Sequence, residues 1–393
     1  MKDFMFHLPT KIYFGKDADK NIGQKLAPYG ASRLLLVYGG GSVKKSGLLG
    51  RIQEDLEKSG ITCLELGGVE PNPKVQLVRQ AVALCRREQV DFILAVGGGS
   101  ALDTAKAVAV CTASNVDPWD LTMKKATATA SIPVGVVLTI AAAGSEVSNA
   151  FVLNNPEVPK KKGCMHELLR PKVAFLNPEN TYTVPPFQTA CGVVDAMMHT
   201  MERYYSRNSG TELVDRIAEA ILQTLKHQGR VALEDPCNYE ARAAVMWAAT
   251  LSTSPLTLCG KDIALSTVHQ LENGVSGLFE QVAHGAGLSV LYPAWAKYVY
   301  RHDIRRFCQM AVRVWGVSMD YEHPEQVALA GIEAMKDFFR SLGMPVTMEE
   351  IGIGEDSFET MADMITANGT YAVPSYIPLG KQEVMDIFRL AEK

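Results

Sequence analysis

The pattern of hydrophobic residues changes near Pro185 and Pro186, and this change constrains the fold more than any other feature of the chain. Before it, short β-rich runs alternate with segments of helical periodicity, whereas after it helical periodicity is nearly continuous. A double proline disfavours helix before it and suits the first turn of a helix after it. We therefore expect an α/β domain over residues 1–185 and an all-helical domain over residues 186–393.

Four apolar runs in the first half are predicted to be buried strands, at 34–38, 63–66, 91–96 and 133–139. The stretches between them, near 46–59, 73–88 and 101–112, have helical spacing. This alternation predicts a mainly parallel sheet covered by helices, and ligands bind such sheets at the carboxyl ends of the strands. In the second half, helices are predicted near 187–206, 211–228, 239–253, 262–276, 286–300 and 303–315.

A glycine run follows the strand predicted at 91–96, in the order strand, Gly97, Gly98, Gly99, Ser100 and helix. Glycines in this place expose backbone N–H groups at a helix N-terminus, which suits a pyrophosphate. The run is neither a Gly-x-Gly-x-x-Gly fingerprint nor a Walker A loop. A plain tight turn is the alternative interpretation.

A second run, Gly39, Gly40, Gly41 and Ser42, follows the strand predicted at 34–38. NAD-binding proteins usually place an acidic side chain at such a strand end, to accept from the ribose 2′-hydroxyl. The sequence has none there, and it offers Ser42 and nearby lysines as donors. This favours NADP(H) over NAD(H), the alternative being a loop with solvated lysines.

Asp195, His199, His269 and His284 are the residues best suited to bind a metal ion. Asp195 and His199 are four positions apart, so on a helix they share one face. Their neighbours are almost all apolar, and a divalent ion would compensate a carboxylate buried there. His269 also has apolar neighbours, and the glycines after His284 allow a close backbone approach. The alternative is a surface pair with satisfied core histidines.

Charge and composition exclude several classes of function. The net charge is −4, and the densest basic cluster is only Lys160 to Lys162, so a nucleic-acid partner is not expected. No apolar run approaches the roughly 18 residues that span a bilayer. The N-terminal residues do not resemble a signal peptide, and the eight cysteines are scattered singly. We expect a cytoplasmic protein with reduced thiols, none of which binds the metal.

Several motifs along the whole chain carry a family resemblance. They are Phe14-Gly-Lys, Tyr38-Gly-Gly-Gly-Ser-Val-Lys-Lys-Ser-Gly, Gly68-Val-Glu-Pro-Asn-Pro, Ala95-Val-Gly-Gly-Gly-Ser, Ala143-Gly-Ser-Glu, Val193-Val-Asp-Ala-Met-Met-His-Thr, Val245-Met-Trp-Ala-Ala-Thr and Ala283-His-Gly-Ala-Gly-Leu. In this order they resemble the iron-containing (group III) alcohol dehydrogenases, and most closely the NADPH-dependent butanol dehydrogenase and aldehyde reductase branch.

The resemblance implies a dinucleotide-binding α/β domain, a helical domain, a divalent metal in the cleft between them and a homodimer. It implies that Asp195, His199, His269 and His284 are the metal ligands. The residues that it assigns to the cofactor are Gly39, Gly40, Gly41, Ser42, Gly97, Gly98, Gly99, Ser100, Asp103, Thr139 and Lys161, with Lys161 near the 2′-phosphate. Asp and three His suit Fe(II) or Zn(II) almost equally, and the resemblance favours iron.

The chain departs from the family pattern in two places. Family members commonly carry a second histidine one turn after the third ligand, where this chain has Asn273. That position would face the substrate pocket, so the loss of an imidazole affects proton relay. The gap from His269 to His284 is also one residue longer than usual, which indicates an insertion near 279–281.

The expected reaction is hydride transfer between NADP(H) and a short- to medium-chain alcohol or aldehyde, with the metal acting as Lewis acid on the carbonyl oxygen. A small-molecule substrate is the expected partner. Two alternatives remain. A glycerol-dehydrogenase-like or dehydroquinate-synthase-like enzyme would share the fold, and Asn273 could instead mark a non-catalytic protein that binds nucleotide and metal. Retention of all four ligand residues favours catalysis.

Overall fold

The computed structural model describes residues 1–158, 160–208, 210–262 and 266–392. The chain divides into two compact units, His7–Val184 and Pro185–Lys393, the second of which also includes Met1–Phe6. From the sequence, these first six residues were expected in the α/β domain. In the structure the backbone N–H of Lys2 instead donates a 3.0 Å hydrogen bond to the carbonyl of Gly260.

The described part of the first unit contains a six-stranded parallel sheet in the order β1-β8-β5-β4-β2-β3. Its strands are β1 (Lys11–Phe14), β2 (Arg33–Tyr38), β3 (Thr62–Leu66), β4 (Phe92–Gly97), β5 (Val134–Leu138) and β8 (Val173–Leu176). The central strands are buried along nearly their whole length, which explains their continuous apolar runs. The four strands predicted from sequence are confirmed, but β3 is only partly buried because it lies at the edge of the sheet. Strands β1 and β8 were not predicted.

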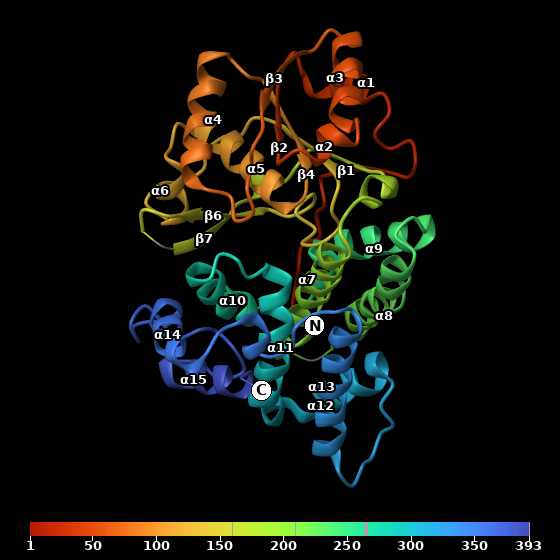
Figure 1. Ribbon diagram of the computed structural model, residues 1–393, viewed down its shortest axis with the longest axis vertical. Coiled ribbons are helices and arrows are strands. Elements are labelled where there is room, and N and C mark those ends of the chain that lie inside the picture. The colour runs from red at the N-terminus through yellow and green to blue at the C-terminus, as the bar shows by residue number, and fades with distance from the viewer. Residues whose placement is uncertain (159, 209, 263–265, 393) are drawn as a thin grey trace. The chain divides into compact units, whose positions relative to one another are not determined.

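Helices lie on both sides of this sheet (Figure 1). They are α1 (Ile22–Leu26), α2 (Ser42–Lys45), α3 (Leu48–Lys58), α4 (Val75–Arg87), α5 (Gly99–Ser114) and α6 (Pro118–Thr122). The three predicted helices correspond to α3, α4 and α5. Helix α5 is buried on nearly all sides because it packs against β2, β4 and β5 and also against α4. An antiparallel pair, β6 (Ala150–Asn155) with β7 (Lys160–Met165), was not predicted.

The second unit is helical in its described residues, apart from an isolated bridge between Val373 and Leu379. Its helices are α7 (Pro186–Tyr204), α8 (Glu212–Glu234), α9 (Tyr239–Ser252), α10 (Thr267–Leu278), α11 (His284–Val299), α12 (Ile304–Met310), α13 (Pro324–Ser341), α14 (Phe358–Thr366) and α15 (Lys381–Leu390). The six predicted helices are confirmed. The one expected over 262–276 begins at Thr267, and residues 263–265 lie outside the described residues.

Helix α7 is the element against which much of this unit packs. It contacts α8, α9 and α11, and α11 in turn contacts α10, α13 and α15. Residues 189–198 of α7 are all buried, which matches their apolar sequence. The middle of α7 therefore lies in the core of the unit and carries the side chain of Asp195 into that core.

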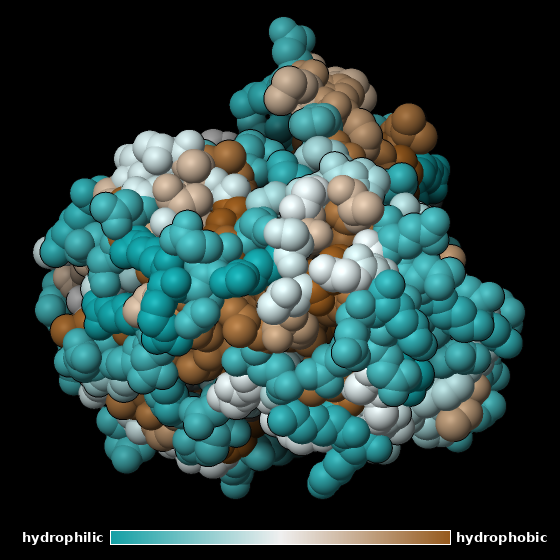
Figure 2. Space-filling view, turned by 90° about the horizontal axis from the view of Figure 1, so that it is seen from above, coloured by the Kyte–Doolittle hydropathy of each residue, from teal (hydrophilic) through white to brown (hydrophobic). Residues whose placement is uncertain are grey.

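Hydrophilic residues cover most of the face seen in Figure 2, and hydrophobic ones show between them in small groups. Among the described residues, no helix combines the length and the apolar composition needed to cross a membrane.

Candidate metal centre and dinucleotide site

Asp195 and His199 lie one turn apart on α7, as the spacing predicted. The side chain of Asp195 is buried, and its Oδ1 lies 3.4 Å from Nε2 of His199. Pro186 at the first position of α7 is compatible with the helix because its missing N–H would have no partner within the helix. The helix thus directs one carboxylate and one imidazole to the same point.

Two further histidines reach this point from other helices. Nε2 of His269, on α10, lies 3.5 Å from Oδ1 of Asp195, and Nε2 of His284, the first residue of α11, lies 3.8 Å from it. The rings of His199 and His269 stack, with centroids 4.2 Å apart. The ligand atoms of Asp195, His199 and His269 all lie within 4.8 Å of one another, a set that does not include His284.

These distances fit a bound divalent ion. Atoms held about 2.0–2.2 Å from a tetrahedral ion lie about 3.3–3.6 Å from one another, close to the separations from Asp195 to the three imidazoles. Oδ1 of Asp195 and Nε2 of His269 are buried, and no hydrogen-bond partner for either atom is found within the described structure. Such atoms are costly to bury unless something binds them, so the donor set suits a cation.

The protonation of the centre also favours a cation. Burial would raise the pKa of Asp195, but the three histidines hold it below its usual range. Burial lowers the pKa of His199 well below its usual value, and His269 lowers it further. Burial would also lower the pKa of His269, yet Glu202 and Asp195 raise it to about 10. The carboxylates around His269 therefore favour a positive charge at this ring, which a divalent ion would supply in place of the second ring proton.

Two buried glutamates beside the histidines were missed in the sequence analysis. Glu202, on α7, contacts His269, and Glu272, on α10, contacts His284. The sequence contains a signal for them, because each glutamate follows one of the histidines by three positions within an apolar helix. A charged residue in such a setting is rarely buried without a partner.

Asn273 is half-buried and lies one turn after His269 on α10. This is the position where the family resemblance places a residue of the substrate pocket, and that role stays a prediction. The additional residue expected near 279–281 falls in the connection between α10 and α11.

The two glycine runs lie at the carboxyl ends of neighbouring strands. Strand β2 pairs with β4 in a register that sets Tyr38 opposite Val96, so Gly39 and Gly97 both follow at the same edge. The chain passes from β2 outward to β3 and then returns to β4 on the other side of β2. Such a reversal is a topological switch point, where open α/β sheets leave a crevice for ligands.

The backbone at this edge leaves room for a ligand. A Cβ atom built on Gly40 or Gly99 would meet nothing within 4 Å. Gly98 precedes α5, and the N-terminus of that helix has no side-chain cap, so its N–H groups suit a phosphate. The N–H of Thr139 donates a 3.0 Å hydrogen bond to the carbonyl of Gly97, which places Thr139 beside the glycine run.

The structure corrects the expectation that no acidic side chain lies near the end of β2. Glu65, on the neighbouring strand β3, accepts a hydrogen bond from the hydroxyl of Tyr38. It also accepts a 2.7 Å hydrogen bond from the amide of Gln53 and lies 3.7 Å from the ammonium of Lys44. No acidic residue directly follows β2 along the chain, and the pairing of β2 with β3 brings Glu65 to this place.

Asp103 and Lys161 lie near each other. The Asp103 carboxylate accepts hydrogen bonds from the hydroxyl of Ser145, at 2.8 Å, and from the N–H of Val152, at 2.9 Å. Burial raises the pKa of Asp103, and Lys106 and Lys161 oppose this shift. Asp103 thus connects α5 to the loop after β5 and to β6. A direct contact of Asp103 or Lys161 with the cofactor stays a prediction.

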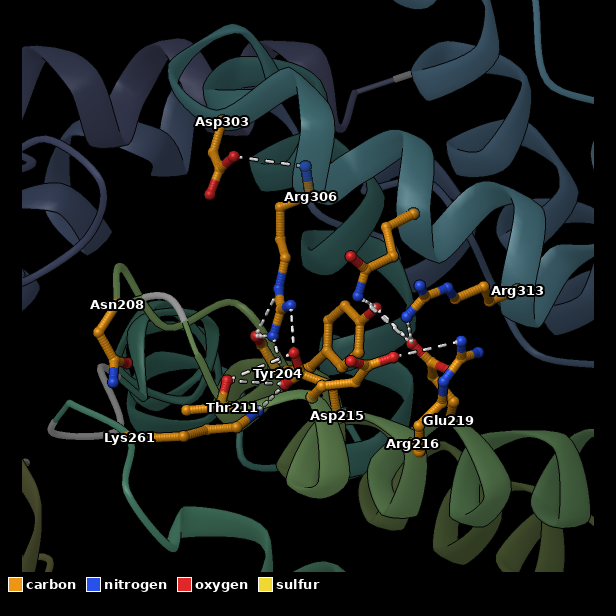
Figure 3. Close-up of polar contacts among 12 residues, drawn as sticks. Tyr204, Asn208, Thr211, Asp215, Arg216, Glu219, Lys261, Asp303, Arg306 and Arg313 are labelled. Atoms are coloured by element: carbon orange, nitrogen blue, oxygen red, sulfur yellow. Dashed lines mark hydrogen bonds and ion pairs between the residues drawn. The ribbon is translucent and has the colours of Figure 1, made fainter. Parts of the chain in front are cut away.

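A second polar cluster lies near the C-terminal end of α7 (Figure 3). Arg306, on α12, forms a bidentate ion pair with Asp215, on α8, and both bonds are 2.6 Å long. Arg306 also donates to the carbonyl of Tyr204, the last residue of α7. The Tyr204 hydroxyl donates to Glu219, which also pairs with Arg313. This cluster fixes α7 to α8 and α12.

A glycine run at a switch point of the sheet, and a buried carboxylate that faces three half-buried imidazoles, fit a metal-dependent dehydrogenase. Comparison with known proteins agrees. The family model described as "Iron-containing alcohol dehydrogenase" matches residues 9–178, and the model described as "Fe-containing alcohol dehydrogenase family, C-terminal" matches residues 189–391.

Individual relatives match over nearly the whole chain. NADH-dependent butanol dehydrogenase A of Clostridium acetobutylicum is 38% identical, over 99% of each chain. NADPH-dependent aldehyde reductase YqhD of Escherichia coli is 37% identical, over 94% of each. The crystal structure of NADH-dependent butanol dehydrogenase A from Thermotoga maritima is 35% identical, covers 100% of this chain and 99% of its own, and superposes with a TM-score of 0.96.

The chain therefore belongs to the iron-containing alcohol dehydrogenase family and is an oxidoreductase. Membership implies a nicotinamide cofactor and a divalent metal.

Proposed function

We propose that this protein is a metal-dependent alcohol dehydrogenase and aldehyde reductase that transfers hydride between NADP(H) and short- to medium-chain alcohols or aldehydes. The observation that carries the proposal is the convergence of three imidazole Nε2 atoms on Oδ1 of the buried Asp195. Both the family match and the names of the relatives support the reaction class.

In this proposal Asp195, His199, His269 and His284 hold one Fe(II) or Zn(II) ion. Such an ion, when bound, acts as a Lewis acid that polarises a carbonyl oxygen. Asp195 supplies the negative charge that offsets the cation, and the buried setting strengthens this attraction. Asn273 has no titratable group, so a proton reaches the product from water or from the cofactor.

The dinucleotide is proposed to lie along the carboxyl ends of β2 and β4. Its pyrophosphate would accept hydrogen bonds from the N–H groups of Gly98, Gly99 and Ser100 at the start of α5. Thr139 would support the loop through its bond to Gly97. The Asp103 carboxylate would hold the loop that contains Ser145.

A preference for NADP(H) is supported by the surroundings of Gly39 to Ser42. Ser42 and the lysines that follow can donate to a 2′-phosphate, with Lys161 as a further candidate. Glu65, the acidic group near this strand end, is already bonded to Tyr38 and Gln53, so it is poorly placed to accept from a ribose 2′-hydroxyl. The family contains relatives named for either cofactor, so both require measurement.

The test is the initial rate of NADPH and NADH oxidation with butanal, on protein stripped of metal and reloaded with Fe(II) or Zn(II). We expect a rate that depends on metal and is faster with NADPH. Asp195→Ala should bind NADPH but lose turnover by several orders of magnitude. A stripped protein that is as active as the reloaded one would contradict the metal assignment.

The same assay separates the alternatives. Net oxidation of NADPH by a simple aldehyde excludes an enzyme that regenerates its own cofactor, such as a dehydroquinate-synthase-like protein. Binding of NADPH without turnover of any aldehyde or polyol would support the non-catalytic alternative. We also propose a cytoplasmic homodimer, which the family resemblance implies and which sedimentation would test.

A further inference from the structure

Each of two histidines in the candidate metal centre has a buried glutamate on its other ring nitrogen. Nδ1 of His269 lies 2.6 Å from Oε2 of Glu202, and Nδ1 of His284 lies 2.5 Å from Oε2 of Glu272. A carboxylate can only accept, so both Nδ1 atoms must carry the proton. In a neutral imidazole this leaves the Nε2 lone pair available, and Nε2 is the atom that faces Asp195.

The two glutamates share a sequence pattern, but each contacts a histidine on a neighbouring helix. Glu202 comes three positions after His199 on α7, and Glu272 comes three positions after His269 on α10. Glu202 reaches from α7 to His269 on α10, and Glu272 reaches from α10 to His284 on α11. The two contacts therefore link the three helices that supply the candidate ligands.

Glu202 also fixes the backbone at the start of α10. Its Oε1 accepts from the N–H of Val268 at 2.6 Å and from the N–H of His269 at 3.2 Å. Ser266, which precedes the helix, makes no side-chain cap. The carboxylate of Glu202 thus satisfies amides that a helix start leaves unpaired, and it sets both the ring and the backbone of His269.

Space for Glu272 is provided by a glycine on α11. A Cβ atom on Gly287 would lie 2.8 Å from Cγ of Glu272, closer than real contacts allow. Cγ is near the base of the side chain, so Glu272 could not avoid this contact by a change at its tip. Gly287 therefore permits the position from which Glu272 bonds to His284.

We propose that Glu202 and Glu272 are positioning residues that fix the Nδ1-protonated forms of His269 and His284 and so direct both Nε2 atoms toward a shared cation. This inference rests on the metal centre of the proposed function. Carboxylates that hold ligand histidines in this way stabilise the required tautomer and increase the basicity of the ligand. The cost of burying both carboxylates is offset by hydrogen bonds to the rings.

The test measures metal binding directly. Metal-free wild type, Glu202→Gln and Glu272→Gln are titrated with Zn²⁺ against a competing chelator, and with Co²⁺ while its visible absorption bands are recorded. We expect each variant to bind Zn²⁺ about 10- to 100-fold more weakly. We also expect altered Co²⁺ bands, because a neutral glutamine oxygen accepts from the ring more weakly than a carboxylate and no longer increases the basicity of the ligand. Glu219→Gln is the matched control, since Glu219 is as deeply buried but pairs with Arg313.

A further variant separates positioning from loss of fold. Gly287→Ala keeps both carboxylates but displaces Glu272, so it should weaken Zn²⁺ binding as Glu272→Gln does. The double variant Gly287→Ala/Glu272→Gln should bind Zn²⁺ little more weakly than either single variant, because both substitutions act on the contact between Glu272 and His284. Near-UV circular dichroism of the metal-free proteins shows whether each variant folds. Glu272→Gln does not alter the hydrogen bonds from Glu202 that cap α10.

Zn²⁺ affinities within twofold of wild type in both glutamine variants would overturn the positioning role. His199→Ala would still lose the metal in that case, and the proposed function would stand. A wild-type protein that binds neither Zn²⁺ nor Co²⁺ would instead overturn the metal centre itself.

Discussion

Asp215 shows how a single buried charge contributes to the stability of the helical unit. Its carboxylate is bound by both ends of the Arg306 guanidinium and by the ammonium of Lys261, at 2.8 Å (Figure 3). Burial would raise the pKa of Asp215, but Arg306 and Lys261 lower it below its usual value. The ionised form is therefore the one that the fold stabilises.

We predict that Asp215→Asn lowers the free energy of unfolding at pH 7 by about 3–5 kcal/mol, because it leaves two buried cations without their counter-charge. Because the pKa of Asp215 is lower in the folded state than in the unfolded state, its ionised form stabilises the fold at pH values above the unfolded-state pKa. This stabilisation is lost as the pH falls through the folded-state pKa. The difference between variant and wild type should therefore shrink below about pH 4. Urea unfolding at pH 7 and pH 3.5 measures both effects.

The exposed pair between Asp337 and Arg340 provides a control, since Asp337→Asn should change stability by less than about 0.5 kcal/mol. A loss from Asp215→Asn that stays the same at both pH values would show that the charge is not its source.

At the level of helices, the approach of α11 to α7 depends on Gly285. A Cβ atom there would lie 2.6 Å from Cα and from the carbonyl oxygen of Cys191 on α7. Alanine in a helix is favoured over glycine by up to about 1 kcal/mol, but backbone atoms of a buried helix cannot move aside. The steric cost therefore exceeds the gain in helix propensity.

We predict that Gly285→Ala lowers the free energy of unfolding by about 1–3 kcal/mol. It should also weaken Zn²⁺ binding, because His284 is the preceding residue on the displaced helix. Gly277→Ala, on α10, is the control. Its Cβ would meet only the terminal methyl of Met364, at 3.2 Å, which can rotate away. Equal stability of the two variants would mean that α11 accommodates the added methyl by a small shift.

At the scale of the molecule, the residues proposed to bind the metal and those proposed to bind the dinucleotide belong to different units. The candidate metal ligands lie in Pro185–Lys393, and the glycine runs lie in His7–Val184. A ligand that binds only the folded state stabilises it, by about 2.7 kcal/mol at 100 times its Kd. Zn²⁺ and NADPH should therefore each stabilise first the unit that contains its own binding site.

We predict that Zn²⁺ slows hydrogen exchange in peptides from α7, α10 and α11 of metal-free protein, by up to about 100-fold at that excess. NADPH should slow exchange in peptides from 92–114 and 134–145. Mass spectrometry of the exchanged peptides measures both. In His199→Ala the effect of Zn²⁺ should vanish while that of NADPH remains. Equal slowing of both units by Zn²⁺ alone would contradict this division of the sites.

Much of the architecture could be predicted because it depends on local periodicity. Short apolar runs predicted β2 to β5, interrupted in β3 by Glu65, and helical spacing predicted α3 to α5 and α7 to α12. The short strand β1 is only partly buried and lies at the sheet edge, so its residues carry little hydrophobic signal. The β6–β7 pair was also not predicted.

The sequence by itself determined the change from α/β to helical structure, the two glycine runs and the helical spacing of Asp195 and His199. These features depend on residues a few positions apart, whose geometry the backbone sets. Only the tertiary structure decided that Glu202 holds His269, that Glu272 holds His284 and that Glu65 reaches Tyr38. Such contacts join residues up to 67 positions apart, as between Glu202 and His269, and the packing of helices and strands selects them.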